Sequence, residues 1–382
     1  MLESKYDVTI IGGGPSGSTC GYLLSQQGLR VAIIDKARFP REKLCGGLLT
    51  LKTLRIVEQV FHETKHSLAR DKIINFQSYS QEGFFRNRRL SCNSSNFPFC
   101  FVDRKVYDNY LLKKAKKAGA DVLEEETPTF INYATNKIMT SKGRTWKTKY
   151  IIGADGANSK TRRSLFAEPQ NISSWRKNLA TALEVYIEKK DLPQSVNSPK
   201  IFFGFINWGY AWIFPNSHRI VVGLGGLNRK NGKNFVACFQ DFLDSMGLAG
   251  QKTSVIRGHS VPYGNFLETP VRGKTLLVGD AAGFVDPILG EGIFYAHKTA
   301  QLASAAIIAD MQKTKNLQTA YQELLNDSVL PQLKAAAALR RIVFNRFNTY
   351  TQFIAVQILL NLFNEKMMKM IHEENSYRWF KN

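Results

Sequence analysis

A glycine-rich turn near the N-terminus constrains the fold more than any other stretch of the chain. Residues 6–36 read YDVTIIGGGPSGSTCGYLLSQQGLRVAIIDK, which is an apolar run, three spaced glycines, a helical stretch and a second apolar run. Gly12, Gly14 and Gly17 have the G-x-G-x-x-G spacing, and Asp35 closes the second apolar run. This order predicts a strand, a tight turn, a helix and a parallel strand, the arrangement that binds a dinucleotide.

Each residue of this turn has its own physical reason. Gly12 permits the tight turn, Gly14 lets a pyrophosphate approach the backbone, and Gly17 lets the helix pack closely on the strand. The N-terminus of the helix supplies amide donors and the positive end of the helix dipole to the phosphates. We expect Asp35 to accept hydrogen bonds from an adenosine ribose.

The rest of the chain predicts further α/β units interrupted by an antiparallel sheet. Residues 106–117 form an amphipathic helical pattern, and residues 149–152 form a buried strand that ends at Asp155. Residues 171–265 change to alternating stretches such as ALEVYIE and KIFFGFI, which indicate antiparallel strands. The predicted units are a discontinuous dinucleotide-binding domain at residues 1–170 and 266–315, an antiparallel substrate domain at 171–265 and a helical region at 316–382.

The net charge limits the kinds of partner that the protein can have, and the cysteine pattern indicates its cellular compartment. Lys and Arg number 52 against 31 Asp and Glu, a net charge of +21 that favours acidic partners such as an anionic membrane, a phosphorylated substrate or an acidic redox protein. No nucleic-acid motif accompanies the basic runs, so we expect no nucleic-acid partner. The five cysteines are odd in number and lack a C-x-x-C pair, and the six histidines lack a metal spacing. We therefore expect a cytoplasmic protein without a structural metal, and no signal peptide ahead of the first strand.

Four separated segments together resemble the glutathione-reductase-type FAD flavoproteins of the hydroxylase-like branch. They are the first glycine turn, Arg104, the turn at residues 155–156, and VGDAAGFVDPILGEGI at residues 278–293. The resemblance implies a Rossmann-like domain with one extended FAD, where Arg104 lies along the dinucleotide and Asp280 bonds the ribityl chain. It implies cofactor contacts from Gly12, Gly14, Pro15, Ser16, Gly17, Asp35, Lys36, Cys45, Gly46, Gly47, Arg104, Asp155, Gly279, Asp280, Gly290, Gly292 and Ile293. For Asp155, a purely local Asx turn is an equal alternative.

Two further stretches resemble the geranylgeranyl reductase family. PREKLCGG at residues 40–47 is similar to its P-x-x-K-x-C-G-G segment, and YAWIFP at residues 210–215 is similar to its Y-x-W-x-F-P motif. The resemblance covers residues 6 to about 310 and implies reduction of isolated double bonds in prenyl chains of lipids, chlorophyll precursors or quinones. It implies that Cys45 lies beside the isoalloxazine ring, where Gly46 and Gly47 let the backbone pass close to the ring.

The implied catalytic residues are Cys45, Tyr210 and Trp212. Saturating an unactivated alkene builds positive charge on carbon, and the aromatic faces of Tyr210 and Trp212 can stabilise that charge. Cys45 can tune the flavin, relay a proton or shape the cavity. The alternatives are that Cys45 is a small buried apolar residue and that the two aromatic residues, which share one strand face, belong to the core.

Other functions and other sources of electrons stay open. A flavin monooxygenase or a halogenase would share the FAD segments, although a halogenase is expected to carry W-x-W-x-I-P. A flavin-carrying module that only binds a membrane is the alternative outside enzymes. Because no second dinucleotide turn follows, the electrons are expected from transient NAD(P)H or a reduced ferredoxin-type protein.

The C-terminal region has two interpretations. Arg340, Arg341, Lys366 and Lys369 flank the apolar stretch QFIAVQILLNLF at residues 352–363, a mixture typical of helices that lie on the inner face of a membrane. The stretch is too short to cross a bilayer. In the other interpretation these helices pack on the body, and the basic surface docks an acidic electron donor.

Overall fold

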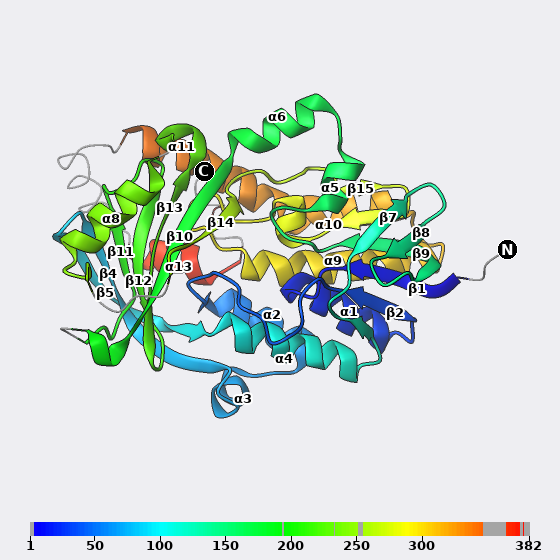
Figure 1. Cartoon of the computed structure of the whole chain (residues 1–382), viewed down its shortest axis with the longest axis horizontal. Coiled ribbons are helices and arrows are strands. Elements are labelled where there is room, and N and C mark those ends of the chain that lie inside the picture. The colour runs from blue at the N-terminus through cyan, green and yellow to red at the C-terminus, as the bar shows by residue number, and fades with distance from the viewer. Residues whose placement is uncertain are drawn as a thin grey trace.

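The computed structural model describes residues 4–192, 195–232, 234–250, 255–346, 364–374 and 377. Two eight-stranded sheets lie at opposite ends of the elongated molecule, with helices packed between and beside them (Figure 1). The predicted fold class, an α/β body with an antiparallel sheet and a helical C-terminal region, is confirmed.

The first sheet contains the predicted dinucleotide-binding strands. Its parallel part has the order β16-β9-β1-β2-β6, β15 pairs antiparallel with β16, and the β7–β8 hairpin extends from β9. All four residues of β2 are buried, which explains why this strand is a continuous apolar run. The strands are β1 (Ser4–Ile11), β2 (Val31–Ile34), β6 (Asp121–Leu123), β7 (Pro128–Asn132), β8 (Lys137–Thr140), β9 (Thr145–Gly153), β15 (Val271–Arg272) and β16 (Thr275–Leu277).

Helices from distant parts of the sequence cover this sheet. Helix α1 contacts both α4 and α9, and α9 also contacts α2 and α10. His297 of α9 joins three of them, because its Nδ1 lies 2.7 Å from the Thr19 hydroxyl of α1 and its Nε2 lies 2.8 Å from the Tyr107 hydroxyl of α4. These helices are α1 (Pro15–Gln26), α2 (Leu51–Phe61), α4 (Arg104–Lys117), α9 (Ile293–Met311) and α10 (Leu317–Ser328).

The second sheet takes strands from both sides of β9 in the sequence. Its order is β14-β10-β13-β12-β11-β4-β5-β3, antiparallel throughout except that β11 runs parallel to β4. The sequence predicted this sheet from residues 171–265 alone, and the structure adds three strands from residues 48–102. The strands are β3 (Leu48–Leu49), β4 (Ile74–Phe85), β5 (Arg88–Val102), β10 (Leu179–Glu188), β11 (Lys200–Phe203), β12 (Gly209–Pro215), β13 (Arg219–Leu227) and β14 (Arg257–Pro262).

The C-terminal helices pack on the body where they are described. Arg340 of α11 is 3% exposed, and its guanidinium donates to the Tyr263 carbonyl and to Asn178 Oδ1. Arg340 therefore fits the interpretation in which these helices pack on the body and does not face a membrane, whereas Arg341 is exposed. Residues 353–363 and the side chain of Lys366 lie outside the described residues. The remaining helices are α3 (Lys65–Arg70), α5 (Lys160–Leu165), α6 (Pro169–Lys177), α7 (Asn228–Asn231), α8 (Phe235–Ser245), α11 (Leu330–Arg346) and α13 (Asn364–His372).

Across the described ranges, no helix combines the length and the apolar character needed to cross a bilayer.

Candidate functional site

A cavity of about 900 Å³ lies between the two sheets and is lined by residues from both. It brings together nearly all the predicted site residues, which arrive from seven separated segments of the chain. The lining includes Gly12, Gly14, Pro15, Ser16, Asp35, Lys36, Cys45, Gly46, Gly47, Arg104, Asp155, Tyr210, Trp212, Asp280, Gly290, Gly292 and Ile293. Gly17 and Gly279 lie behind this wall, where a Cβ would come within 1.8 Å of the Gly12 carbonyl oxygen and within 2.2 Å of Ser16 Oγ, respectively.

The first glycine turn leaves open space only at its middle glycine. Gly12 has φ of 107°, and a Cβ there would lie 2.3 Å from the Ala154 carbonyl oxygen. At Gly14 the nearest atom to such a Cβ is a guanidinium nitrogen of Arg41, at 3.5 Å. Gly12 and Gly17 therefore serve the packing of the fold, and Gly14 gives the cavity access to the backbone.

Two helices direct their N-termini at this cavity. Helix α1 begins after Gly14 and α9 begins after Gly292, and neither helix has a side-chain cap or an acidic residue in its first turn. The first amides of a helix have no acceptor within the helix, so each end offers free donors and a positive dipole end. The cavity can thus hold anionic or electron-rich groups at two places.

The carboxylates of Asp35 and Asp155 both accept hydrogen bonds from neighbouring protein groups. The carboxylate of Asp35 accepts from the Gly13 amide at 2.7 Å and the Ala37 amide at 2.8 Å, and it lines the cavity. Its predicted ribose contact remains a prediction. Asp155 accepts from the Ser159 and Thr161 hydroxyls and from the amides of Lys160 and Thr161 at the start of α5. These bonds give Asp155 a local structural role at the start of α5. Its contact with the cofactor, the other role that the sequence allows, remains a prediction.

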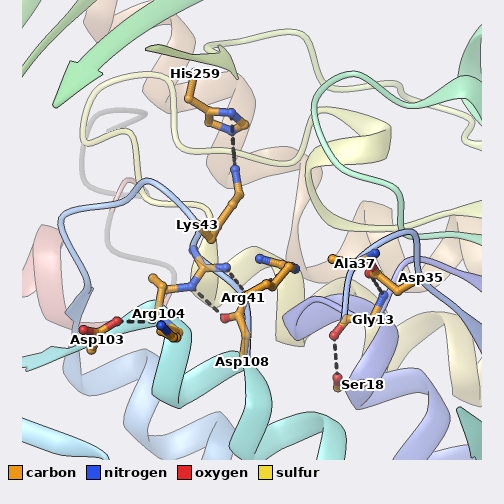
Figure 2. A network of polar contacts seen from close by, with 11 residues as sticks. Gly13, Ser18, Asp35, Ala37, Arg41, Lys43, Asp103, Arg104, Asp108 and His259 are labelled. Carbon is orange, nitrogen blue, oxygen red and sulfur yellow. Dashed lines mark hydrogen bonds and ion pairs between the residues drawn. The ribbon is translucent and has the colours of Figure 1, made fainter. Parts of the chain in front are cut away.

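A network of charged side chains lies beside the cavity, and its cations Arg41, Lys43 and Arg104 line the cavity wall (Figure 2). Arg104 makes a two-pronged pair with Asp108, at 2.7 and 2.9 Å, and Arg41 approaches the same carboxylate at 3.2 Å. Burial disfavours the Arg104 cation, but the interactions with Asp108 and Cys45 together outweigh burial and raise the pKa of Arg104 above its usual range. Cys45 lies close enough to Arg104 to influence its pKa.

Lys43 and His259 form a contact that the sequence analysis did not anticipate. Lys43 reaches from the loop after β2 to His259 on β14, and its ammonium donates to the imidazole Nε2 (Figure 2). Burial lowers the pKa of Lys43 to about 8, although the negative charge of Asp280 acts to raise it. Burial and the Lys43 cation lower the pKa of His259 to about 3, so the imidazole is a neutral acceptor. The only sequence signal was the position of Lys43 within PREKLCGG.

Glu184 is the second group that the sequence analysis missed. It lies in β10, is 3% exposed and lines the cavity. Burial raises the pKa of its carboxyl to about 7, although Lys43 and Arg104 act in the opposite direction. Burial likewise raises the pKa of Asp280. The cavity therefore contains carboxyls that are easier to protonate than usual.

The end of the cavity at the second sheet is apolar and aromatic. The rings of Tyr210 and Trp212 lie 5.9 Å apart in a T-shaped arrangement, and the Tyr210 hydroxyl donates to the Leu289 carbonyl at 2.5 Å. Both residues line the cavity and also pack in a core cluster, so the two predicted alternatives are not exclusive. The apolar lining here is Phe99, Ile201, Phe203, Phe214, Val261, Ile288, Leu289, Val343, Phe344 and Ile371.

Gly46 and Gly47 bring the loop close to protein atoms. A Cβ on Gly46 would lie 2.5 Å from the Phe214 ring, and one on Gly47 would lie 2.1 Å from the Val102 carbonyl oxygen. Gly47 also has φ of 73°. These glycines thus dock the Cys45 loop on the second sheet, and their predicted approach to a flavin ring stays a prediction.

Comparison with known proteins identifies the class. The sequence matches the FAD binding domain family over residues 5–323, and the chain belongs to this family. It is an FAD-dependent oxidoreductase of the superfamily that contains the geranylgeranyl reductases and the flavin hydroxylases.

Individual relatives agree with the predicted resemblance to geranylgeranyl reductases. The chain is 28% identical over 333 residues to the geranylgeranyl diphosphate reductase of Rhodobacter capsulatus, covering 81% of this chain and 77% of that protein. The fold is similar to that of a geranylgeranyl bacteriochlorophyll reductase-like protein from Thermoplasma acidophilum, with a TM-score of 0.75, 19% identity and coverage of 94% and 98% of the two chains. It is also similar to the halogenase PltM, with a TM-score of 0.73, 17% identity and coverage of 94% and 80%.

The residues of the cavity fit an FAD. The uncapped start of α1 and the open space at Gly14 suit a pyrophosphate, and Asp35 stands at the end of β2, where an adenosine ribose is held in such folds. The uncapped start of α9, beside Asp280, suits the polar edge of a flavin.

Proposed function

We propose that the protein is a reductase that saturates isolated C=C bonds of a prenyl chain carried by a lipid, a chlorophyll precursor or a quinone. The observation that carries this proposal is the continuity of one cavity from the two helix N-termini to an apolar, aromatic end, with Cys45 between them. An apolar chain can enter that end while its double bond reaches the cofactor. The relative named as a geranylgeranyl diphosphate reductase supports the same substrate class.

The side chains of the cavity have distinct tasks in this reaction. Reduced FAD, when bound, supplies a hydride to the double bond. The apolar walls exclude water and align the prenyl chain. Tyr210 and Trp212 present their rings to the positive charge that develops on carbon. Cys45, whose sulfur accepts a hydrogen bond from the Gly47 amide at 3.4 Å, shapes the place where the double bond lies.

Electrons reach the protein from outside in this proposal. NAD(P)H that binds transiently, or a reduced ferredoxin-type protein attracted by the net charge of +21, would reduce the cofactor. Stopped-flow mixing of the oxidised protein with each donor separates the two.

A flavin monooxygenase or halogenase is the second candidate, because the halogenase PltM shares the fold. The strand motif of this chain, Tyr210-Ala-Trp212-Ile-Phe214-Pro215, differs from the W-x-W-x-I-P expected of a halogenase. Oxygen consumption coupled to incorporation of oxygen or halide into a product would favour the second candidate.

The deciding experiment is an anaerobic reaction of the chemically reduced protein with a geranylgeranyl-bearing lipid. We expect the flavin absorbance to return, and the lipid to gain one H₂ in mass for each bond reduced. Cys45→Ser should keep FAD bound while it slows this reaction, and Cys238→Ser, on the far helix α8, should not slow it. Equal rates for both variants would mean that Cys45 only fills space.

A further inference from the structure

One row of residues runs across three strands of the second sheet and faces the cavity. Glu184 of β10 pairs with Gly223 of β13, and Gly223 pairs with Trp212 of β12. Gly223 has no side chain, and the Trp212 indole lies over it, so that a Cβ on Gly223 would be 2.8 Å from the indole Nε1. The absence of a side chain at Gly223 therefore brings the indole N–H toward the Glu184 side of the sheet.

Both polar groups of this row are buried without a partner. Among the described residues, Glu184 Oε2 and Trp212 Nε1 have no hydrogen-bond partner, and the two side chains are 3% and 8% exposed. Buried polar atoms normally find a partner, because an unpaired one costs about 1–3 kcal/mol. These two polar groups on one cavity wall are therefore not tied to other side chains of the described ranges and are free to interact with a bound ligand.

The surroundings of Glu184 place its carboxyl beside the reacting centre. The Cys45 backbone amide, Lys43 and Arg104 are all close enough to the Glu184 carboxyl to influence its pKa. A Cβ on the adjacent Gly46 would lie 3.7 Å from Trp212 Nε1, so the Cys45 loop and the Glu184 row meet at one point. The titratable and charged groups around Glu184 are Lys43, Cys45, Arg104, Tyr186, Arg219 and, on β14, Arg257 and His259.

We propose that Glu184 is the proton donor for double-bond reduction, acting from the cavity wall that β10 forms. This proposal rests on the proposed function. The O–H bond of the carboxylic acid breaks and a C–H bond forms at one alkene carbon. The π bond breaks, and the other carbon takes a hydride whose source is the reduced flavin. The carboxylate left behind regains a proton from water before the next cycle.

The ionisation of Glu184 agrees with this role. A proton donor must be protonated near neutral pH, and burial raises the pKa of Glu184 to about 7. The same carboxyl in water would be almost fully ionised at that pH.

The test compares Glu184→Gln with Glu188→Gln, which changes an exposed glutamate in the same strand. General acids contribute about 10²- to 10⁴-fold, so we expect a loss of that order in alkene reduction for Glu184→Gln and none for Glu188→Gln. FAD content and reduction of the flavin by dithionite should not change in either variant. Glu184→Asp, which retains a proton, should recover part of the activity.

Infrared spectroscopy adds a readout that needs no substrate. The oxidised protein should show a protonated carboxyl C=O band that titrates near pH 7 and is absent from Glu184→Gln. If the wild type reduces the alkene and Glu184→Gln does so at the same rate, the role of Glu184 is overturned while the proposed function stands. A wild type that reduces no prenyl substrate overturns the proposed function, and this inference with it.

Discussion

At the scale of single residues, the glycines of the cavity do different work although the sequence shows them alike. Gly12, Gly17 and Gly279 each lie so close to other protein atoms that a Cβ would overlap them. Gly14 has no such neighbour, and the space beside it belongs to the cavity. A substitution at Gly14 therefore tests cofactor binding, whereas one at Gly17 tests folding.

We predict that Gly14→Val yields a folded protein without bound flavin. The valine side chain fits beside Arg41 and fills the place of the pyrophosphate. Purified protein should be colourless, with a circular dichroism spectrum close to that of the wild type and the lower melting temperature of the flavin-free wild type, because bound cofactor stabilises the folded state.

Gly17→Val is the matched control. Even the Cβ of a valine at position 17 would lie only 1.8 Å from the Gly12 carbonyl oxygen. Overpacking of this kind costs about 3 kcal/mol or more. This variant should unfold or lose solubility. If the Gly14→Val protein were yellow, it would still bind flavin, and the assignment of α1 to the cofactor site would be wrong.

The sequence predicted the residues that belong to contiguous motifs and missed those that act across the fold. The glycines, Asp35 and Cys45 stand in recognisable strings, so their meeting at one cavity was foreseeable. His259 is an isolated histidine, and only the pairing of β14 with β10 brings it to Lys43. Glu184 did carry a signal, because it is the one charge inside the apolar stretch ALEVY, on the strand face shared with Ala182 and Tyr186.

At the scale of helices and strands, buried histidines link the elements and make the fold sensitive to acid. His297 is fully buried between α1 and α4, and burial lowers its pKa to about 3. Burial lowers the pKa of His259 to about 3 and that of His372 to about 4. The unfolded chain therefore binds more protons than the folded one below about pH 6.5, the usual histidine pKa.

We predict that folding stability falls as the pH drops from about 6.5 toward 4, because these imidazoles must stay uncharged in the folded state. His297→Gln should lower stability at neutral pH, since it loses the Thr19 and Tyr107 contacts, but it should flatten the pH dependence. Thermal unfolding measured across this pH range checks the slope.

His66→Gln, at an exposed position, is the control and should retain the wild-type slope. If stability depended on pH with the same slope in the wild type, His297→Gln and His66→Gln, the acid sensitivity would come from carboxylates instead.

The strands show why part of the second sheet was not foreseen. Strand β4 reads INFQSYSQEGFF, and most of its residues are partly exposed on both faces. Without one buried face it has no clear alternation of apolar and polar residues, which is the main strand signal. Its place beside β11 depends on a parallel pairing between residues about 120 positions apart, which local pattern cannot reveal.

At the scale of the whole molecule, the net charge of +21 favours a negatively charged partner. A prenyl lipid substrate would bring the protein to a membrane surface, although Arg340 takes no part because it is buried. Each exposed basic residue near an anionic leaflet adds about 1 kcal/mol, which salt screens.

We predict sedimentation with anionic vesicles at low ionic strength, release by salt, and no sedimentation with neutral vesicles. Binding to neither would exclude membrane attachment and leave an acidic electron donor as the partner of the basic surface. Salt-resistant binding to both kinds of vesicle would assign attachment to apolar residues.

The parallel pairing of β11 with β4 limits how this enzyme can be re-engineered. A chimera that exchanges only residues 171–265 for those of a relative would import a β11 evolved against another β4. A mismatched seam leaves strand edges with unpaired amides and carbonyls, and such edges recruit other chains and aggregate. We predict that the smallest unit that can be exchanged without breaking this pairing is two stretches of sequence moved together, residues 48–102 and 179–262, with β9 left in place between them.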